Sequence, residues 1–385
     1  MPKNIILLAT VETKAQAVTF LTKAMKARGL GVTVIDLSLC NDGEIWSQER
    51  KKSAMASRVK TAIQLVQDEL PRSSVVVAMG GGTGGEMGLL VLDQLSLAVP
   101  KILLTTLPFD PRPALARNRI ILVPSLADIE GLNTVLDGAL ALTADIALGL
   151  STRSSNSANP ENDTELRPSI GLTTLGATQG AASRIGHEMA TREMETIAFH
   201  ANGFGGASLI RFALEGGLRA VIDLTPHEIT RLEIAGDCID MPNRFSSQSH
   251  LPRVLLPGAL NFLGLGVLSD VSPEHKARPH YQHSNLFTHV KLTHDEAARV
   301  CTVLAGELNK STAPCSIIMP MGGFSHEDRP GGAIEDAQLR MVAAETLSKA
   351  ASAYDIIEIP HHINDPATAT LVGETLHENI KRTPL

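Results

Sequence analysis

The sequence predicts an α/β protein of two Rossmann-like domains, each a mostly parallel sheet flanked by helices, with a cleft between them. In both halves of the chain, short β-branched or apolar segments alternate with longer segments of helical periodicity, which is the pattern of βαβ units. A Ser-, Asn- and Pro-rich segment without apolar periodicity, residues 151–168, separates the halves and is typical of a linker. We therefore predict domains at residues 1–150 and 169–385, and a chain of 385 residues is long enough for both.

The first half contains five predicted strands and four predicted helices. The strands are residues 4–9, 32–36, 75–79, 101–105 and 120–123, and the helices are residues 14–28, 47–70, 86–95 and 127–150. Gly29 and Pro71 follow the first two helices, at the positions where helices commonly end. Consecutive βαβ units of this length place parallel strands in one sheet with helices on both faces.

The segment MGGGTGG, residues 79–85, is the strongest functional signal in the first half. It follows a valine-rich strand, and its glycines leave room for a ligand to approach the backbone. The helix predicted after it would direct its first amides towards an anion. The residues that we predict to hold a phosphate or carboxylate are Gly81, Gly82, Thr83, Gly84 and Gly85. The alternative is that the glycines only allow a tight connection between strand and helix.

Two common nucleotide-binding motifs do not fit this segment. A P-loop requires Lys and then Ser or Thr where, counting from Gly80, the chain has Glu86 and Met87. A dinucleotide fingerprint follows the first strand of its domain, where this chain has ATVETKA instead. Asp36 ends the second strand, as a ribose-binding acid would, but without the fingerprint it gives little support for NAD. The sequence therefore predicts a phosphate-binding segment of another type.

Two other strand ends are expected at the same edge of the sheet, because ligands of open parallel sheets bind beyond the carboxyl ends of the strands. The segment TVETK follows the first strand, and two threonines end the fourth. A lysine there would supply the charge that the missing P-loop lysine does not. The residues predicted to join the glycine segment are Thr10, Thr13, Lys14, Thr105 and Thr106. The alternative is that the first two cap a helix and that the lysine is solvated.

The second half repeats the alternation of strands and helices. The predicted strands are residues 170–174, 196–200, 220–224, 253–256, 316–319 and 356–359, and the predicted helices are residues 181–191, 208–214, 295–308 and 336–350. The segment GFGG precedes a helix and predicts a second place for an anion or for close backbone approach. The residues assigned to this second-domain site are Gly203, Gly205, Gly206, Thr225 and Asn364.

Strand ends in the second half also supply the candidates for chemistry. Asp223 ends a strand and would serve as a general base or metal ligand, or simply cap the following helix. The segment HINDP follows the last strand, and it adds His362 and Asp365 as predicted catalytic residues. Residues 264–293 are predicted to be irregular. They contain four histidines whose spacing matches no zinc motif, so we expect a surface loop and no metal there.

Composition argues against several classes of function. The net charge of −7 and the pI of about 6.0 do not favour nucleic acid or an anionic membrane as a partner. Aromatic residues make up 3%, too few for a base-stacking surface. The four cysteines show no paired spacing and are expected to be reduced thiols. The N-terminus lacks the pattern of a signal peptide and no apolar stretch is long enough to span a membrane, so we expect a cytoplasmic protein.

Ordered motifs along nearly the whole chain resemble a family of bacterial and fungal proteins. The same family forms the N-terminal, ATP-binding inhibitor domain of a plant tobamovirus-resistance protein. The motifs are TVETK, MGGGTGG, FHANGFGG, VIDLTPHE, PGALNF, HSNLFTHVKLTHDE, GGFSHEDRPGG and HINDP. The chain departs from the family pattern at Glu12, where the family has Asp, at Asn202, where it has Thr, and at Lys291, where it usually has Arg.

The resemblance implies ATP in the first domain, with or without Mg²⁺, and a homodimer, but it supplies no reaction. We expect a nucleotide-binding protein that acts on a small molecule in the cleft by phosphoryl or acyl chemistry. One alternative is a regulatory protein that binds ATP without catalysis. Another is a protein that binds a small organic acid. Neither nucleic acid nor a membrane is an expected partner.

Overall fold

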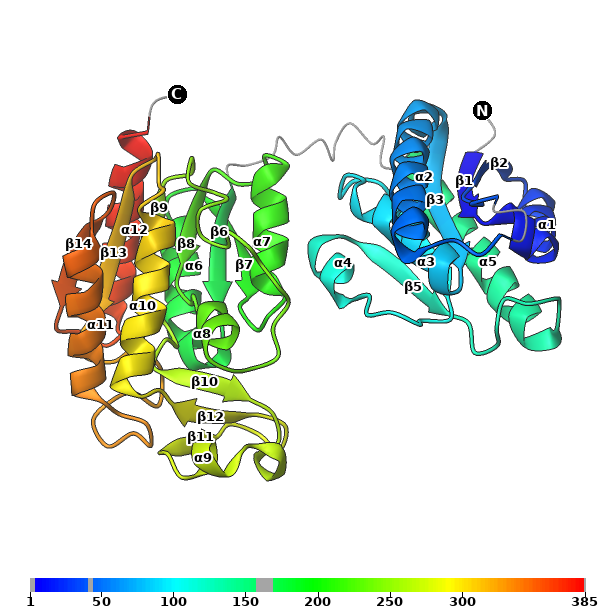
Figure 1. Ribbon diagram of the computed structural model, residues 1–385. Coiled ribbons are helices and arrows are strands. Elements are labelled where there is room, and N and C mark those ends of the chain that lie inside the picture. The colour runs from blue at the N-terminus through cyan, green and yellow to red at the C-terminus, as the bar shows by residue number, and fades with distance from the viewer. Residues whose placement is uncertain (1–3, 41–43, 157–168, 384–385) are drawn as a thin grey trace. The chain divides into compact units, whose positions relative to one another are not determined.

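The computed structural model describes residues 4–40, 44–156 and 169–383 (Figure 1). The chain divides into two compact units, unit 1 (Met1–Thr164) and unit 2 (Glu165–Leu385). Each unit has a large parallel sheet with helices on both faces, so the predicted class, an α/β protein with two Rossmann-like domains, is confirmed. Helix α5 (Thr134–Asn156) continues into the predicted linker, whose residues 157–168 lie outside the described part of the chain.

Unit 1 is built on a five-stranded sheet of order β2-β1-β3-β4-β5, in which every neighbouring pair is parallel. The strands are β1 (Asn4–Ala9), β2 (Gly31–Asp36), β3 (Ser73–Gly80), β4 (Lys101–Thr105) and β5 (Ile120–Pro124). All five correspond to predicted strands. The order is that of flavodoxin-like doubly wound sheets, in which the winding reverses between β1 and β3. Such folds bind ligands in the crevice beyond these two strand ends.

Helices cover both faces of this sheet. They are α1 (Val11–Ala27), α2 (Gln48–Glu69), α3 (Gly82–Asp93), α4 (Arg112–Arg117) and α5, with a 3₁₀ turn η1 (Leu70–Arg72). One apolar cluster joins α1 and α5 to one face of the sheet, and it includes Leu7 of β1. A second cluster joins α2 and α3 to the other face and includes Leu8, as expected for adjacent residues of a strand.

Helix α5 begins at Thr134, later than predicted, because Asn133 Oδ1 accepts hydrogen bonds from the amides of Val135 and Leu136 and so caps the helix. Its stretch Thr134–Thr152 is long and apolar enough to cross a membrane, and it is the one such helix in the described ranges. Leu136 and Leu140 are fully buried in the core of unit 1. The apolar face of α5 therefore packs against the sheet.

Unit 2 repeats this topology in a six-stranded parallel sheet of order β14-β13-β9-β8-β6-β7. The strands are β6 (Ser169–Thr174), β7 (Glu195–His200), β8 (Ala220–Asp223), β9 (Arg253–Leu255), β13 (Cys315–Pro320) and β14 (Asp355–Ile359). Counted from β6, this is the order of unit 1 with one further strand. The winding therefore reverses between β6 and β8, and the segments after these two strands meet at the ligand-binding edge.

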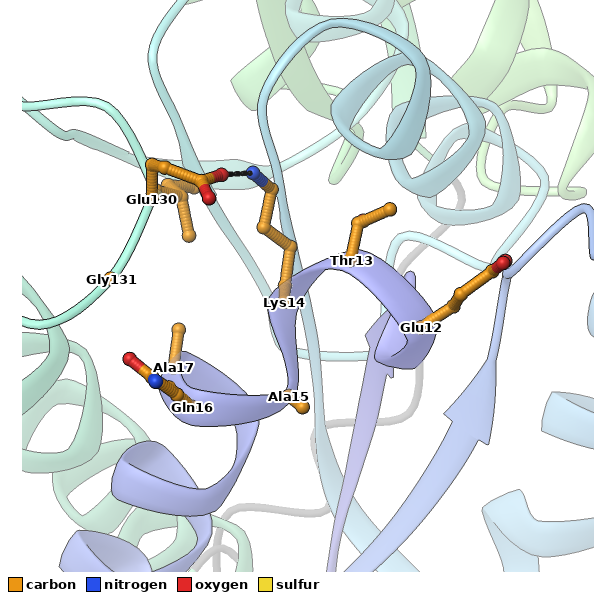
Figure 2. A pocket seen from close by; sticks show the side chains of 9 residues that line it. Glu12, Thr13, Lys14, Ala15, Gln16, Ala17, Glu130 and Gly131 are labelled. Atoms are coloured by element: carbon orange, nitrogen blue, oxygen red, sulfur yellow. Dashed lines mark hydrogen bonds and ion pairs between the residues drawn. The ribbon is translucent and has the colours of Figure 1, made fainter. Parts of the chain in front are cut away.

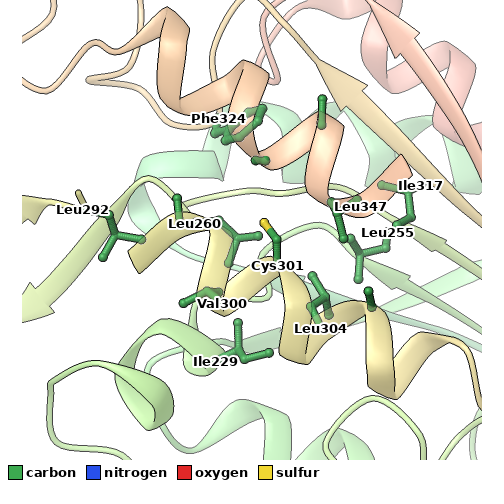
Figure 3. Close-up of a cluster of buried hydrophobic side chains, with 14 of the residues drawn as sticks. Ile229, Leu255, Leu260, Leu292, Val300, Cys301, Leu304, Ile317, Phe324 and Leu347 are labelled. Atoms are coloured by element: carbon green, nitrogen blue, oxygen red, sulfur yellow. The ribbon is translucent and has the colours of Figure 1, made fainter. Parts of the chain in front are cut away.

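Two helical layers enclose this sheet. The helices are α6 (Gln179–Ala190), α7 (Gly205–Leu214), α8 (Glu228–Glu233), α9 (Pro273–Lys276), α10 (His294–Leu308), α11 (Ala337–Ala350) and α12 (Pro366–Lys381), with 3₁₀ turns η3 (Gly176–Thr178) and η4 (Leu268–Asp270). Helices α10 and α11 pack with Leu255, Ile317 and Phe324 in the cluster of Figure 3. Val254 and Ile318 belong instead to the cluster with α6 and α12, on the opposite face.

The segment predicted to be irregular contains a second sheet. β10 (Phe262–Leu265), β11 (His280–Gln282) and β12 (Thr288–Lys291) pair antiparallel in the order β10-β12-β11. The prediction for residues 264–293 was wrong because strands of three or four residues are too short to show a period in the sequence.

Candidate functional sites

The predicted glycine loop of unit 1 is mostly helix. β3 ends at Gly80 and α3 begins at Gly82, so only Gly81 lies between them. The Gly85 amide donates to the Gly81 carbonyl oxygen at 2.9 Å and closes the first turn. No described residue caps α3 with a side chain or accepts a hydrogen bond from the amides of Gly82, Thr83 and Gly84. These are the unsatisfied donors of a helix N-terminus.

Packing requires some of these glycines and not others. A methyl group at Gly80 would overlap the amide nitrogen of Gly85, and one at Gly85 would lie 2.7 Å from the Gly80 carbonyl oxygen. These two glycines let α3 pack closely on the end of β3. They therefore fit the alternative interpretation, in which the glycines only allow a tight connection between strand and helix. A methyl group at Gly82 would meet nothing within 4 Å. The close connection therefore does not explain Gly82.

The structure brings the three predicted strand ends together at the start of α3. A methyl group at Gly84 would lie 3.1 Å from Thr10 Oγ1, and one at Gly85 would lie 2.9 Å from Thr105 Oγ1. Thr105 is fully buried, and its Oγ1 accepts a hydrogen bond from the Leu107 amide at 3.3 Å. The segments after β1, β3 and β4 therefore converge as predicted, whereas ligand binding by their residues stays a prediction.

The loop after β5 also reaches the start of α3. A methyl group at Gly81 would lie 3.6 Å from Thr106 Oγ1 and 3.9 Å from Asp128 Oδ1. Asp128 lies in the loop after β5, where its Oδ1 accepts a hydrogen bond from the Ile129 amide. Asp128 was not predicted as a site residue, because residues 127–150 were expected to be helical.

Lys14 lies in a neighbouring pocket. It occupies a kink in α1 (φ −125°, ψ 26°), and its Nζ is 3.1 Å from Glu130 Oε2 (Figure 2). Lys14, Thr13 and Glu130 line a pocket of about 200 Å³ whose lining does not include the glycine segment. The side chain of Glu130 is 76% exposed, so an anion entering the pocket competes with a solvated carboxylate for the lysine.

The start of α1 is covered by the protein's own side chains. Asp36 Oδ1 accepts from the Val11 amide at 3.0 Å, and Ser38 Oγ accepts from the Glu12 amide at 3.0 Å. Although burial opposes the effect, the hydrogen bonds from Ser38 and Val11 hold the pKa of Asp36 below its ordinary value. Asp36, the residue at the place of a ribose-binding acid, therefore serves to anchor α1.

In unit 2 the anion at the GFGG segment belongs to the protein itself. Glu228 Oε1 accepts hydrogen bonds from the amides of Gly203 and Gly206, at 3.1 Å and 2.9 Å. A methyl group at Gly206 would overlap the Glu228 carboxylate, and one at Gly205 would overlap the His200 carbonyl. The glycines therefore permit a close approach, as predicted, and the group that approaches is Glu228.

Asp223 belongs to a buried network of ion pairs. Its Oδ1 accepts from Arg244 Nη2 at 2.8 Å, and its Oδ2 lies 3.4 Å from Arg253 Nε. Arg244 also pairs with Glu228, and each of the four side chains is at most 3% exposed. Burial lowers the pKa of Arg244, but the carboxylates of Asp223 and Glu228 outweigh this effect and raise it above its ordinary value. These ion pairs give Asp223 a structural role, although its Oδ2 accepts no hydrogen bond within the described residues, and a catalytic role for it stays a prediction.

The HINDP residues connect three loops of unit 2. His362 Nδ1 accepts from the Asn364 amide at 3.0 Å, and its Nε2 is 2.9 Å from the Ser325 carbonyl oxygen. Asp365 Oδ2 accepts from the His362 amide, and Asn364 Oδ1 accepts from the Ala181 amide near the start of α6. Both ring nitrogens of His362 thus have backbone partners, which is the pattern of a positioning role.

Thr225 is also hydrogen-bonded within the protein. It is fully buried, its Oγ1 lies 2.7 Å from Thr178 Oγ1, and its amide donates to Thr173 Oγ1. These hydroxyls tie together the segments that follow β6 and β8, at the reversal of winding.

Two of the four histidines that were predicted to lie in a surface loop without a metal belong to a group beside this edge, and one of them, His289, is buried. His283, His289 and Glu327 have potential ligand atoms that all lie within 4.8 Å of one another. His289 is 9% exposed and Glu327 is 7% exposed. Burial, with added effects from His227 and His283, lowers the pKa of His289 to about 3, so its imidazole is neutral near pH 7. Spacing alone could not reveal this group, because tertiary packing brings Glu327 to the histidines.

The fold and these strand-end sites define an α/β protein of two units, each with the strand order of flavodoxin-like sheets. The chain belongs to the uncharacterised protein family UPF0261. The N-terminal domain of that family matches residues 41–156, and its C-terminal domain matches residues 167–380. The family membership that the motifs predicted is thus confirmed.

Relatives of this chain occur in bacteria and in a plant. A UPF0261 protein of Clostridium tetani is 26% identical over 405 residues, with 98% of both chains covered. A UPF0261 protein of Rhizobium meliloti is 30% identical over 300 residues, or 76% of this chain and 74% of the relative. The ToMV resistance protein Tm-1 of Solanum lycopersicum is 23% identical over 330 residues, which cover 84% of this chain and 44% of the tomato protein.

Proposed function

We propose that unit 1 binds the phosphates of a nucleotide, ATP, at the N-terminus of α3. The observation that carries the proposal is the first turn of this helix, where three amides have no partner among the described residues and Gly82 adjoins open space. Helix N-termini favour anions because their amides and the helix dipole both attract negative charge. Three other helix starts at glycine or strand-end segments are covered by the chain's own groups, namely Asp36 at α1, Glu228 at α7 and Asn364 at α6.

The position of α3 in the sheet supports the same proposal. It follows β3 at the reversal of winding, where flavodoxin-ordered folds bind phosphate-bearing cofactors. The hydroxyls of Thr10 and Thr106 lie beside the glycines and can donate to phosphate oxygens. The geometry argues for an anion, and the choice of ATP rests on the family resemblance of the motifs.

Asp128 favours a nucleotide that arrives with Mg²⁺. Its carboxylate lies near Gly81, where it would repel a bare phosphate. Mg²⁺ is commonly held by one or two carboxylates together with substrate phosphates. We therefore propose that the bound species is ATP with Mg²⁺.

The proposal is one of binding. The groups nominated for phosphoryl or acyl chemistry, Asp223, His362 and Asp365, all lie in unit 2 and are held in hydrogen bonds or ion pairs. Such chemistry on a small molecule stays a prediction, and the release of ADP or AMP in the presence of small acids would be its readout.

The experiment is a calorimetric titration of ATP, with and without Mg²⁺, into the wild type, Gly82→Asp and Gly82→Asn. A carboxylate at this position favours the helix N-terminus and occupies the place of the phosphate, so Gly82→Asp should fold and bind ATP at least about tenfold more weakly. Gly82→Asn has nearly the same shape without the charge, and it should lose less affinity.

Two results would overturn the assignment. One is a wild type that binds no nucleotide, and the other is a Gly82→Asp variant that binds ATP as tightly as the wild type. Binding of a small dicarboxylate in place of ATP, weakened by Gly82→Asp, would support the anion site and reject the nucleotide. Melting temperatures of the three proteins check that each one is folded.

A further inference from the structure

We propose that His283, His289 and Glu327 of unit 2 bind a divalent transition-metal ion. Two histidines and one carboxylate are the donor set of many catalytic zinc sites and of non-haem iron sites, in which the remaining positions are left to water or substrate. The potential ligand atoms of the three residues all lie within 4.8 Å of one another. Ligand atoms around a tetrahedral Zn²⁺ are roughly 3.4 Å apart, given bonds of about 2.1 Å. His283 is exposed at a hairpin turn, so rotation of its side chain can close the difference.

Unsatisfied buried atoms point to a missing ligand. Glu327 Oε2 is buried and has no hydrogen-bond partner in the described structure, and no described lysine or arginine pairs with this carboxylate. His289 Nδ1 is also buried without a partner. Buried polar groups are nearly always satisfied, and a buried charge without a partner is especially costly. A bound cation would compensate the carboxylate and use the imidazoles as neutral donors.

The surrounding structure holds His289 in place. Tyr281 of β11 pairs with His289 of β12, and His283 follows the end of β11. The His289 ring stacks on Phe262 at 4.0 Å between centroids and on His283 at 4.9 Å. Such support restricts the orientation of a ligand, as metal centres require.

The loop that carries Glu327 is equally constrained. Asp328 accepts from the Phe324 amide at 2.9 Å and pairs with Arg340, and the His326 amide donates to the Ala177 carbonyl oxygen. A methyl group at Gly332 would overlap the carbonyl of Glu327, so the second glycine pair of GGFSHEDRPGG is required for this turn. A methyl group at Gly323, in the first glycine pair, would overlap the Asp328 carbonyl oxygen, so the loop requires a glycine on each side of its acidic residues.

The three residues lie where a ligand is expected from topology. A methyl group at Gly176, in the segment after β6, would lie 3.5 Å from His283 Cε1, and the winding of the large sheet reverses at β6. Glu327 also lines a pocket of about 600 Å³ together with Tyr281 and Arg329. The ion would thus adjoin a space large enough for a small molecule, and Arg329 suits a substrate with an oxyanion.

The test uses Co²⁺ as a spectroscopic probe on the full chain after dialysis against a chelator. The wild type should bind one Co²⁺ per chain with the visible absorption of a low-coordinate site, and Zn²⁺ or Fe²⁺ should displace it. His283→Ala and Glu327→Gln should each weaken binding about 100-fold or more. His326→Gln, in the same loop and pocket but outside the ligand group, is the matched control and should bind as the wild type does.

His283 is exposed, so His283→Ala keeps the test valid even if Glu327→Gln is poorly folded. A wild type that binds no Co²⁺, or binding that survives both ligand substitutions, would overturn the proposal. Because the metal site lies in unit 2 and the nucleotide site in unit 1, each proposal can fail without the other.

Discussion

At the scale of the residue, glycines that look alike in the sequence have different physical roles. Gly82 adjoins open space at the start of α3, whereas Gly206 lies directly against the Glu228 carboxylate at the start of α7. Both follow the pattern of a strand, a glycine segment and a helix. The first is free to receive an external anion, and the second already holds an internal one.

This difference predicts that Gly206→Ala destabilises unit 2. The added methyl group would overlap the Glu228 carboxylate and displace it from its amides and from Arg244, inside a network that is almost fully buried. We expect a loss of about 3 kcal/mol in the free energy of unfolding, since disturbing a buried ion-pair network is costly. Thermal and urea unfolding followed by circular dichroism would measure it.

The matched control is Gly306→Ala, at an exposed position of α10 where a methyl group would meet nothing within 4 Å. It should leave stability unchanged or raise it by up to about 1 kcal/mol, because alanine favours helix. Equal stability of the two variants would show that Glu228 can move without cost.

The sequence predicted that glycines mark both helix starts, but it could not tell which anion each one holds. Glu228 follows Gly206 by 22 residues, and only the tertiary fold brings them together. His289 and Glu327 are a similar case, since the spacing of the histidines matches no metal motif. Glycine and helix-start signals are local, whereas the identity of the partner depends on packing between distant segments.

At the scale of the element, the strands of the parallel sheets and most of the long helices were predictable. Every strand of the two parallel sheets was predicted, because buried parallel strands are continuous apolar runs. The short antiparallel strands β10, β11 and β12 were missed, as was the last helix, α12. The start of α3 was misplaced to residue 86 because glycines disfavour helix, and here tertiary packing against β3 outweighs that preference.

Helix α11 gives a pH-dependent prediction. Its N-cap Asp336 accepts from the Leu339 amide and pairs with Lys291 Nζ at 2.8 Å and His294 Nε2 at 3.1 Å. Burial opposes the effect, but these partners lower the pKa of Asp336 to about 2. The unfolded chain binds this proton near pH 4, so the stabilisation is present above about pH 4 and is lost as the pH falls towards 2.

Asp336→Asn keeps the cap and removes the ion pairs. We expect it to cost about 1 kcal/mol at pH 7, since the pairs are only partly buried, and the difference from the wild type should shrink as the pH falls from 5 to 3. Urea unfolding at several pH values would measure this. Glu345→Gln, which removes an exposed pair with Lys349 on the same helix, should change stability by less than about 0.5 kcal/mol. A difference for Asp336→Asn that does not vary with pH would contradict the assignment.

At the scale of the whole molecule, the chain repeats one architecture twice. Both units have the same order of parallel strands, with one further strand in unit 2, and both place polar motifs after the ends of these strands. The proposed phosphate site of unit 1 follows β3, whereas the proposed metal site of unit 2 takes its histidines from the small sheet and Glu327 from the loop after β13. The sequence predicted the repeated alternation, whereas the homodimer and the cytoplasmic location stay predictions.

This architecture predicts that each unit folds without the other. Among the described residues, each buried apolar cluster draws its members from a single unit, so each unit has a hydrophobic core of its own. Separate expression of residues 1–164 and 165–385 should give two proteins that unfold cooperatively. Trp46, the single tryptophan of the chain, lies in unit 1, so its fluorescence reports that unit alone. We expect the same urea midpoint for Trp46 in the full chain and in the first fragment. A fragment that shows no cooperative transition, or a midpoint that falls markedly on separation, would show that the two units stabilise each other.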